Sequence, residues 1–199
     1  MSVDAVVAAL RAGKLALVPT DTVYGLAANP YREQFVERLY KAKGRDPQQP
    51  TALVASDVEL LFECVPELRG RAGTIARALL PGPYTLVLPN PGRRYRWLTG
   101  KTPEAIGVRV PDVSGPAAEL LRRVGAYAAS SANARGGADP RSLDEVPEEI
   151  RAHAAAELDC GPLPGTPSTV LDFTSREPRV LREGAAPSEE ALRLVAQVL

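Results

Sequence analysis

The sequence contains very few residues that could act as nucleophiles or bind metals through sulfur or nitrogen. Its 199 residues include only two cysteines, Cys64 and Cys160, and a single histidine, His153. Two isolated cysteines cannot build a disulfide framework, and we interpret both as free, buried thiols. One histidine excludes a histidine-based metal cluster and gives little support to a Ser-His-Asp triad. We therefore predict no protein-bound metal, and we interpret His153 as part of a solvated helix face.

The chain also lacks an excess of charge and a long hydrophobic run. Lys plus Arg and Asp plus Glu each number 24, so no global field attracts nucleic acid or acidic membranes. The longest uncharged stretch, residues 78–92, contains four prolines and is shorter than the roughly 20 residues that span a bilayer. Charged residues interrupt the apolar N-terminal residues, whose spacing is that of an amphipathic helix rather than a signal peptide. We expect a cytoplasmic protein with no membrane partner.

Two common nucleotide-binding motifs are absent as well. Neither GxxxxGK[ST] nor GxGxxG occurs, so neither a P-loop nor a fingerprint dinucleotide site is supported. A nucleotide would have to be held by other loops.

The apolar pattern predicts an α/β fold. Short apolar runs bounded by Pro, Gly or Asp predict strands at residues 15–18, 52–55, 85–88, 106–110, 126–129, 169–173 and 179–181. Helical periodicity predicts helices at residues 3–12, 32–42, 66–79, 115–123, 144–152 and 188–198. Strands follow one another irregularly between the helices, which favours a mixed sheet over a regular doubly wound one. We expect a single domain over residues 1–199.

Several loops at strand ends combine polar residues with glycine or proline. The segment PTDTVYGL, residues 19–26, suits a ligand-binding loop but also a turn that caps the next helix. Lys43 and Arg45 follow a predicted helix, where they could stabilise its dipole or bracket a phosphate or carboxylate. Pro81–Thr85 predicts a rigid turn with a structural role.

Three further segments leave both a structural and a functional interpretation open. Arg109 lies inside an apolar strand, where a structural acid or a ligand carboxylate could be its partner. Ser131 and Asn133, before two glycines, could bind a ligand or form an Asx or Ser turn. The Pro/Gly-rich residues 161–168 predict either a lid or an ordinary connector.

Taken together and in this order, seven segments resemble one family. They are PTDTVYGL, KGR, PGPYT, GVRVP, SSAN with its following GG, GTPSTVLD and LREGA. Each is weak alone, but the set covers nearly the whole chain and resembles the YrdC/TsaC family of L-threonylcarbamoyl-AMP synthases, in its single-domain bacterial form.

The resemblance implies a twisted mixed sheet flanked by helices, with a concave, positively charged face. It also implies that L-threonine, bicarbonate and ATP, with Mg²⁺ on the triphosphate, give threonylcarbamoyl-AMP and pyrophosphate. That product serves the threonylcarbamoyladenosine modification of tRNA at position 37, so tRNA or downstream transfer proteins would be partners.

The resemblance further implies roles for individual residues. Lys43 and Arg45 would be the catalytic cations. The ATP-binding set would be Lys43, Arg45, Gln49, Ala105, Ser131, Asn133, Asp139 and Arg182. The threonine-binding set would be Thr22, Arg109, Ala129 and Ser168.

One stretch departs from the family pattern, which commonly reads RPxxNPLxxH after the lysine. Here Gln49 stands in place of the asparagine and Val54 in place of the histidine. Two alternatives keep the same fold: a carbamoyl-adenylate-forming module of enzymes that mature hydrogenases, and an RNA-binding paralogue without catalysis.

Overall fold

The computed structural model describes residues 2–199 and contains a nine-stranded mixed sheet. Its strands are β1 (Leu15–Val18), β2 (Gly25–Ala28), β3 (Ala52–Ala55), β4 (Tyr84–Pro89), β5 (Ala105–Arg109), β6 (Ala126–Ser131), β7 (Ala154–Glu157), β8 (Thr169–Asp172) and β9 (Arg179–Arg182). Their spatial order is β7-β1-β2-β6-β3-β5-β4-β8-β9. Parallel pairs (β1 with β7, β3 with β5, β4 with β8) alternate with antiparallel ones, which confirms the mixed sheet.

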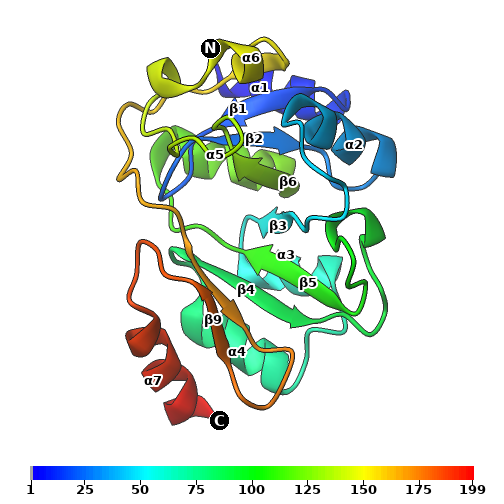
Figure 1. Cartoon of the computed structure of the whole chain (residues 1–199), viewed down its shortest axis with the longest axis vertical. Coiled ribbons are helices and arrows are strands. Elements are labelled where there is room, and N and C mark those ends of the chain that lie inside the picture. Colours follow the sequence, from blue (N-terminus) through cyan, green and yellow to red (C-terminus); the bar gives the residue numbers. More distant parts are fainter. Residues whose placement is uncertain (1) are drawn as a thin grey trace.

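Helices pack along the sheet and cover much of it (Figure 1). They are α1 (Val3–Arg11), α2 (Glu33–Ala42), α3 (Val58–Cys64), α4 (Arg71–Leu79), α5 (Gly115–Val124), α6 (Glu148–Arg151) and α7 (Ser188–Val198), with 3₁₀ turns η1 (Arg96–Leu98) and η2 (Leu143–Glu145). The upper part of Figure 1 holds α1, α2, α5 and α6 around β1, β2 and β6, and the lower part holds α4 and α7. Within residues 2–199, no helix is both long and apolar enough to cross a bilayer.

The core divides between the two faces of the sheet because side chains alternate along each strand. In β3, Leu53 joins the cluster under α3 and α4, whereas its neighbour Val54 joins the cluster under α1 and α5. In β1, Ala16 packs with that second cluster and Leu17 with a third, beneath α2.

Two strands and one helix escaped the sequence prediction. β2 (Gly-Leu-Ala-Ala) and β7 (Ala-Ala-Ala-Glu) have no β-branched residues, and alanine favours helices. They are strands because they pair with β1, β2 along one edge of it and β7 along the other. The helix predicted at 66–79 begins only at Arg71, and α3 precedes it. The helix predicted at 144–152 is the 3₁₀ turn η2 followed by the single-turn α6.

The predictions for the cysteines and the histidine need partial correction. His153 is exposed as expected, but it lies in the turn between α6 and β7 rather than on a helix face. Both thiols are free, yet Cys64 is only partly buried and Cys160 is exposed, so the prediction that they are buried was wrong. Cys160 lies in the segment between β7 and β8, outside any helix or strand.

A crossover segment, residues 158–168, connects β7 to β8 and runs down one side of the molecule (Figure 1). The Tyr24 hydroxyl donates to the carbonyl of Gly161 (2.9 Å) and accepts from the amide of Cys160 (2.9 Å). The amide of Gly165 donates to the carbonyl of Thr22 (2.8 Å). Burial raises the pKa of Tyr24 to about 12, so the hydroxyl keeps its proton for donation. These contacts hold the segment against the β1–β2 loop and favour a fixed connector over a mobile lid.

We expect Tyr24→Phe to lower the free energy of unfolding by about 0.5–1.5 kcal/mol, because it removes the hydrogen bonds to the partly buried backbone groups of Cys160 and Gly161. Urea unfolding measures the change. Tyr84→Phe is the matched control, since Tyr84 is also buried but its hydroxyl makes no hydrogen bond among residues 2–199. Equal stability of the two variants would contradict the role given to the Tyr24 hydroxyl.

Candidate functional site

A cleft of about 690 Å³ lies on one face of the sheet. Cross-strand partners point to the same face, and the floor of the cleft follows this rule: Val54 pairs with Arg109, Val87 with Gly107, and Thr85 with Val170. Small residues line the floor in the middle of the sheet, where Gly107 pairs with Val87 and Ala129 with Ala52. The charged lining residues are Arg45, Lys101, Arg109, Asp172, Arg179 and Arg182. A pocket of this volume accommodates a small-molecule ligand.

A smaller cavity of about 160 Å³ also contains Arg45 and Ser131, which line the cleft too. Its other walls are made by Lys43 at the C-terminus of α2, Gln49 in the following loop, and Asn133 just after β6. Four residues of the predicted ATP-binding set other than Arg45 therefore meet here: Lys43, Gln49, Ser131 and Asn133.

Lys43 and Arg45 do not use their side chains to cap α2. The Lys43 ammonium donates to the carbonyl oxygen and to Oδ1 (2.9 Å) of Asn133. Arg45 donates through Nη1 to Ser130 Oγ (3.0 Å) and through Nη2 to the carbonyl of Pro50 (2.6 Å), and its buried Nε has no partner within residues 2–199. Since these contacts cross to β6 rather than return to the helix, the helix-dipole interpretation does not account for them.

The electrostatics of this pair differ from those of surface cations. Burial, and to a smaller extent the charge of Arg45, lower the pKa of Lys43 to about 8 against the opposing charge of Asp139. Burial also lowers the pKa of Arg45. Neither side chain forms an ion pair with a carboxylate among residues 2–199, so an anion entering here would meet two cations that have no carboxylate in direct contact.

The SSAN segment forms the turn that sequence analysis left as one alternative, and it also faces the small cavity. Ser131 Oγ donates to Asn133 Oδ1 (2.9 Å), and Asn133 Nδ2 donates to the carbonyl of Gly137 (2.7 Å). The turn thus fixes the Asn133 oxygens that accept from Lys43.

Arg109, the last residue of β5, has the structural partner that was one of its two predicted alternatives. Its Nη2 donates to Asp21 Oδ1 and to Thr22 Oγ1 (2.7 Å), and the second Asp21 oxygen accepts from the amide of Asp112 (3.0 Å). Thr20 Oγ1 lies 3.0 Å from Thr22 Oγ1 and ties the loop to the carbonyl of Val23 (2.8 Å). Arg109 also lines the cleft, and its Nη1 makes no hydrogen bond within residues 2–199, which leaves this group for a ligand.

Ser168 also lines the cleft. Its Oγ lies 2.8 Å from Thr85 Oγ1, and Arg182 donates to its carbonyl through Nε (3.1 Å) and Nη2 (2.8 Å). Gly184 makes this packing possible, because a Cβ there would lie 2.2 Å from the carbonyl oxygen of Pro167. Burial of the Arg182 guanidinium lowers its pKa, Asp139 raises it, and Arg109 lowers it again.

Of the remaining predicted site residues, two line the cleft and two do not. Ala105 and Ala129 line the cleft. Asp139 lines neither cavity but is close enough for its charge to act on Lys43 and Arg182. Thr22 does not line the cleft itself and acts through its hydrogen bond to Arg109.

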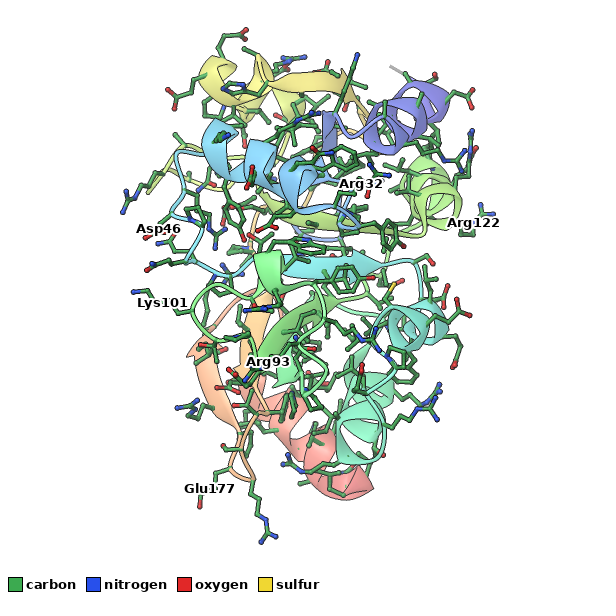
Figure 2. The ribbon with its side chains drawn as sticks, turned by 90° about the vertical axis from the view of Figure 1, so that its right-hand side faces the viewer. Arg32, Asp46, Arg93, Lys101, Arg122 and Glu177 are labelled. Carbon is green, nitrogen blue, oxygen red and sulfur yellow. The ribbon has the colours of Figure 1, made fainter. Side chains whose placement is uncertain are left out.

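The sequence analysis missed several residues of the cleft. Thr85 belongs to a segment interpreted as a purely structural turn, yet it lines the cleft beside Ser168. Asp21 was part of the PTDTVYGL loop, and only its distant partner Arg109 reveals its role. Lys101 projects from the same side of the molecule as Asp46 (Figure 2) and lines the mouth of the cleft. An isolated lysine after a glycine carried no signal.

Fold and cleft together define a class: a mixed α/β protein with a ligand-sized cleft lined by cationic and hydroxyl side chains. The model of the Sua5/YciO/YrdC family, described as telomere recombination, matches residues 8–184. The chain belongs to this family.

Relatives with curated names are similar over nearly the whole chain. The Threonylcarbamoyl-AMP synthase of Pyrococcus abyssi is 35% identical over 192 residues, which are 95% of this chain and 56% of that protein. The Putative threonylcarbamoyl-AMP synthase of Mycobacterium tuberculosis H37Rv is 34% identical over 194 residues, 97% of this chain and 87% of the relative. The crystal structure of P. abyssi Sua5 complexed with L-threonine has a TM-score of 0.88 at 34% identity and covers 98% of this chain. The chain spans 58% of that crystallised protein.

The lowered pKa of Lys43 predicts a pH-dependent affinity for polyphosphates. Because the pKa is about 8, the ammonium is charged below that pH and neutral above it, and a polyanion binds the charged form better. We expect the affinity for ATP to fall as the pH rises from 7 to 9.5, by up to about tenfold per pH unit above the pKa. Isothermal titration calorimetry at a series of pH values measures it.

Lys43→Met should bind ATP more weakly and lose most of this dependence, whereas Lys101→Met should retain it. A wild-type affinity that does not change between pH 7 and 9.5 would contradict the titration of Lys43 in the site.

Proposed function

We propose that this protein is a threonylcarbamoyl-AMP synthase, which converts L-threonine, bicarbonate and ATP to threonylcarbamoyl-AMP and pyrophosphate. The observation that carries the proposal is a cleft with an adjoining small cavity, which together bring an ion-paired arginine, Arg109, near three cations that have no ion pair among residues 2–199: Lys43, Arg45 and Arg182. Such a cleft suits an amino acid carboxylate at one end and a triphosphate at the other. The curated names of the relatives support the same reaction.

The chemistry requires anion stabilisation rather than a protein nucleophile. The amine of threonine attacks bicarbonate or CO₂ to give a carbamate. An oxygen of the carbamate then attacks the α-phosphorus of ATP and displaces pyrophosphate. Negative charge accumulates on phosphate oxygens in this step, and preorganised cations stabilise it. Lys43 and Arg45 take that role, with Mg²⁺ entering as part of the nucleotide substrate.

The amino acid occupies the Arg109 end of the cleft in this proposal. The free Nη1 of Arg109 donates to the carboxylate, and Thr22 fixes the guanidinium plane. Ser168 and the backbone near Ala129 border the same region. The Pyrococcus structure that contains L-threonine supports this ligand class.

ATP occupies the other end and the adjoining small cavity. Its phosphates face Lys43, Arg45 and Arg182, and Ser131 and Asn133 supply polar contacts. The backbone near Ala105 and Asp139 borders the nucleotide. Gln49 replaces the family's usual asparagine at the small cavity with a longer amide of the same chemistry.

The wider setting of the reaction is part of the proposal too. The continuous sheet supports a single domain over residues 1–199. In this proposal the protein acts in the cytoplasm. The product passes to tRNA or to proteins that transfer the threonylcarbamoyl group to position 37, and that contact is transient.

The activity is tested by measuring pyrophosphate release with ATP, bicarbonate and each amino acid in turn. Release should require both bicarbonate and L-threonine, and valine should be a poor substrate because it leaves the polar groups around the threonine hydroxyl unpaired. Release with ATP alone, or equal release with serine and valine, would refute the proposal.

Variants of Lys43 and Arg45 separate a catalytic role from a stabilising one. Lys43→Ala and Arg45→Ala should each slow turnover about a hundredfold, since a lost phosphate-stabilising cation costs roughly 3 kcal/mol. Arg45→Lys should also be slow, because it keeps the charge but loses the planar guanidinium. Pyrophosphate release and thermal unfolding measure the two effects.

Lys41→Ala is the control for the helix dipole. Lys41 is the exposed basic residue in the last turn of α2, so its loss should cost at most about 1 kcal/mol of stability and leave turnover unchanged. Turnover near that of the wild type in all three Lys43 and Arg45 variants would overturn the site assignment.

A further inference from the structure

The cleft contains two electrostatically different kinds of cation. Arg109 forms an ion pair with Asp21, and the two side chains are only 10% and 9% exposed. Lys43, Arg45 and Arg182 donate only to uncharged oxygens and form no ion pair among residues 2–199. Arg109 therefore has a carboxylate in direct contact, whereas the other three cations have none; Asp139 acts on Lys43 and Arg182 without forming an ion pair with either.

Asp21 cannot easily leave Arg109. One carboxylate oxygen accepts from the guanidinium and the other from the amide of Asp112, so the backbone after β5 also holds it. A buried charge separated from its partner is strongly unfavourable, which keeps the pair closed when a ligand arrives. The pair presents the unpartnered Nη1 of Arg109 to the cleft but carries no net charge.

The neutralisation of Arg109 by Asp21 matters because another cation, Arg182, lies near Arg109. The charge of Arg109 acts on Arg182, and Arg182 in turn is held on Ser168 in the same cleft. Without Asp21, Arg109 and Arg182 would together form a second site with two free positive charges. A polyphosphate gains most from such a site, whereas a single carboxylate can be held by aligned N–H donors alone.

We propose that Asp21 determines which anion binds where. By neutralising Arg109 it prevents Arg109 and Arg182 from forming a second polyphosphate site beside that of Lys43 and Arg45, and it reserves Arg109 for a ligand with a single carboxylate. The identity of that ligand as threonine rests on the proposed function, but the sorting of anions by charge requires only the two groups of cations. Asp21 acts through Arg109 and is a specificity-determining positioning residue.

Calorimetric titration with inorganic pyrophosphate tests the proposal directly. The wild-type protein should bind one pyrophosphate, and saturating pyrophosphate should change its affinity for L-threonine by less than about threefold. Asp21→Asn should bind a second pyrophosphate, and pyrophosphate should now compete with L-threonine and weaken its apparent affinity at least tenfold.

Asp112→Asn is the matched control. It removes the same charge three residues from Arg109, but the Asp112 side chain is exposed and forms no ion pair among residues 2–199. It should keep one pyrophosphate site and unchanged threonine binding. A merely structural role of Asp21 would weaken threonine binding without creating a second pyrophosphate site.

A folded Asp21→Asn variant with one pyrophosphate site would overturn the proposal. Competition between pyrophosphate and L-threonine for one site in the wild type would overturn it as well, and this measurement needs no variant if Asp21→Asn does not fold. A second pyrophosphate site in Asp21→Asn, with no threonine binding in either protein, would support the sorting of anions and refute threonine as the ligand.

Discussion

The ion pair between Asp21 and Arg109 connects parts of the chain that the sheet alone would leave apart. Asp21 follows β1 and Arg109 ends β5, and three strands lie between them in the sheet. The loop after β1 must therefore reach across those strands, and Thr20 and Thr22 fix its path through their hydroxyls. The same loop accepts the amide of Gly165 from the crossover segment, which leads directly to Ser168. Loop, strand end and crossover segment thus depend on one buried charge pair.

The small residues of the sheet have a comparable importance for the cleft. Gly25, Gly107 and Ala129 would each bring a bulky side chain into the cleft if they were replaced by the β-branched residues that strands usually prefer. The floor is open because these strands contain residues that make poor strands by propensity. Small residues contribute little packing on the cleft face of the sheet. The same strands pack through larger side chains on the opposite face, where Leu53 and Val108 are completely buried.

Much of the fold could be predicted from periodicity, because most strands are apolar and most helices are amphipathic. β7 could not, since an alanine run carries no period and only its parallel pairing with Leu15–Leu17 of β1 makes it a strand. For the site, spacing singled out Lys43, Arg45 and Arg109 but left a structural role open for each. Their partners Asn133 and Asp21 are about ninety residues away in sequence, so no local pattern could show which alternative holds. The resemblance supplied the sets of residues, and the contacts show how they are held.

The crossover segment has a consequence for how the chain acquires its shape during synthesis. β1 pairs with β7, whose Ala154 lies opposite Leu15, and β4 pairs with β8, whose Thr169 lies opposite Tyr84. Contacts between residues so distant in sequence are slow to form, because the intervening chain must first be closed into a loop. A nascent chain still lacking β8 and β9 has neither Ser168 nor Arg182, although Lys43 and Arg45 have long been made. Folding on the ribosome therefore completes this cleft last, and an incomplete chain has no finished pocket in which to hold a ligand.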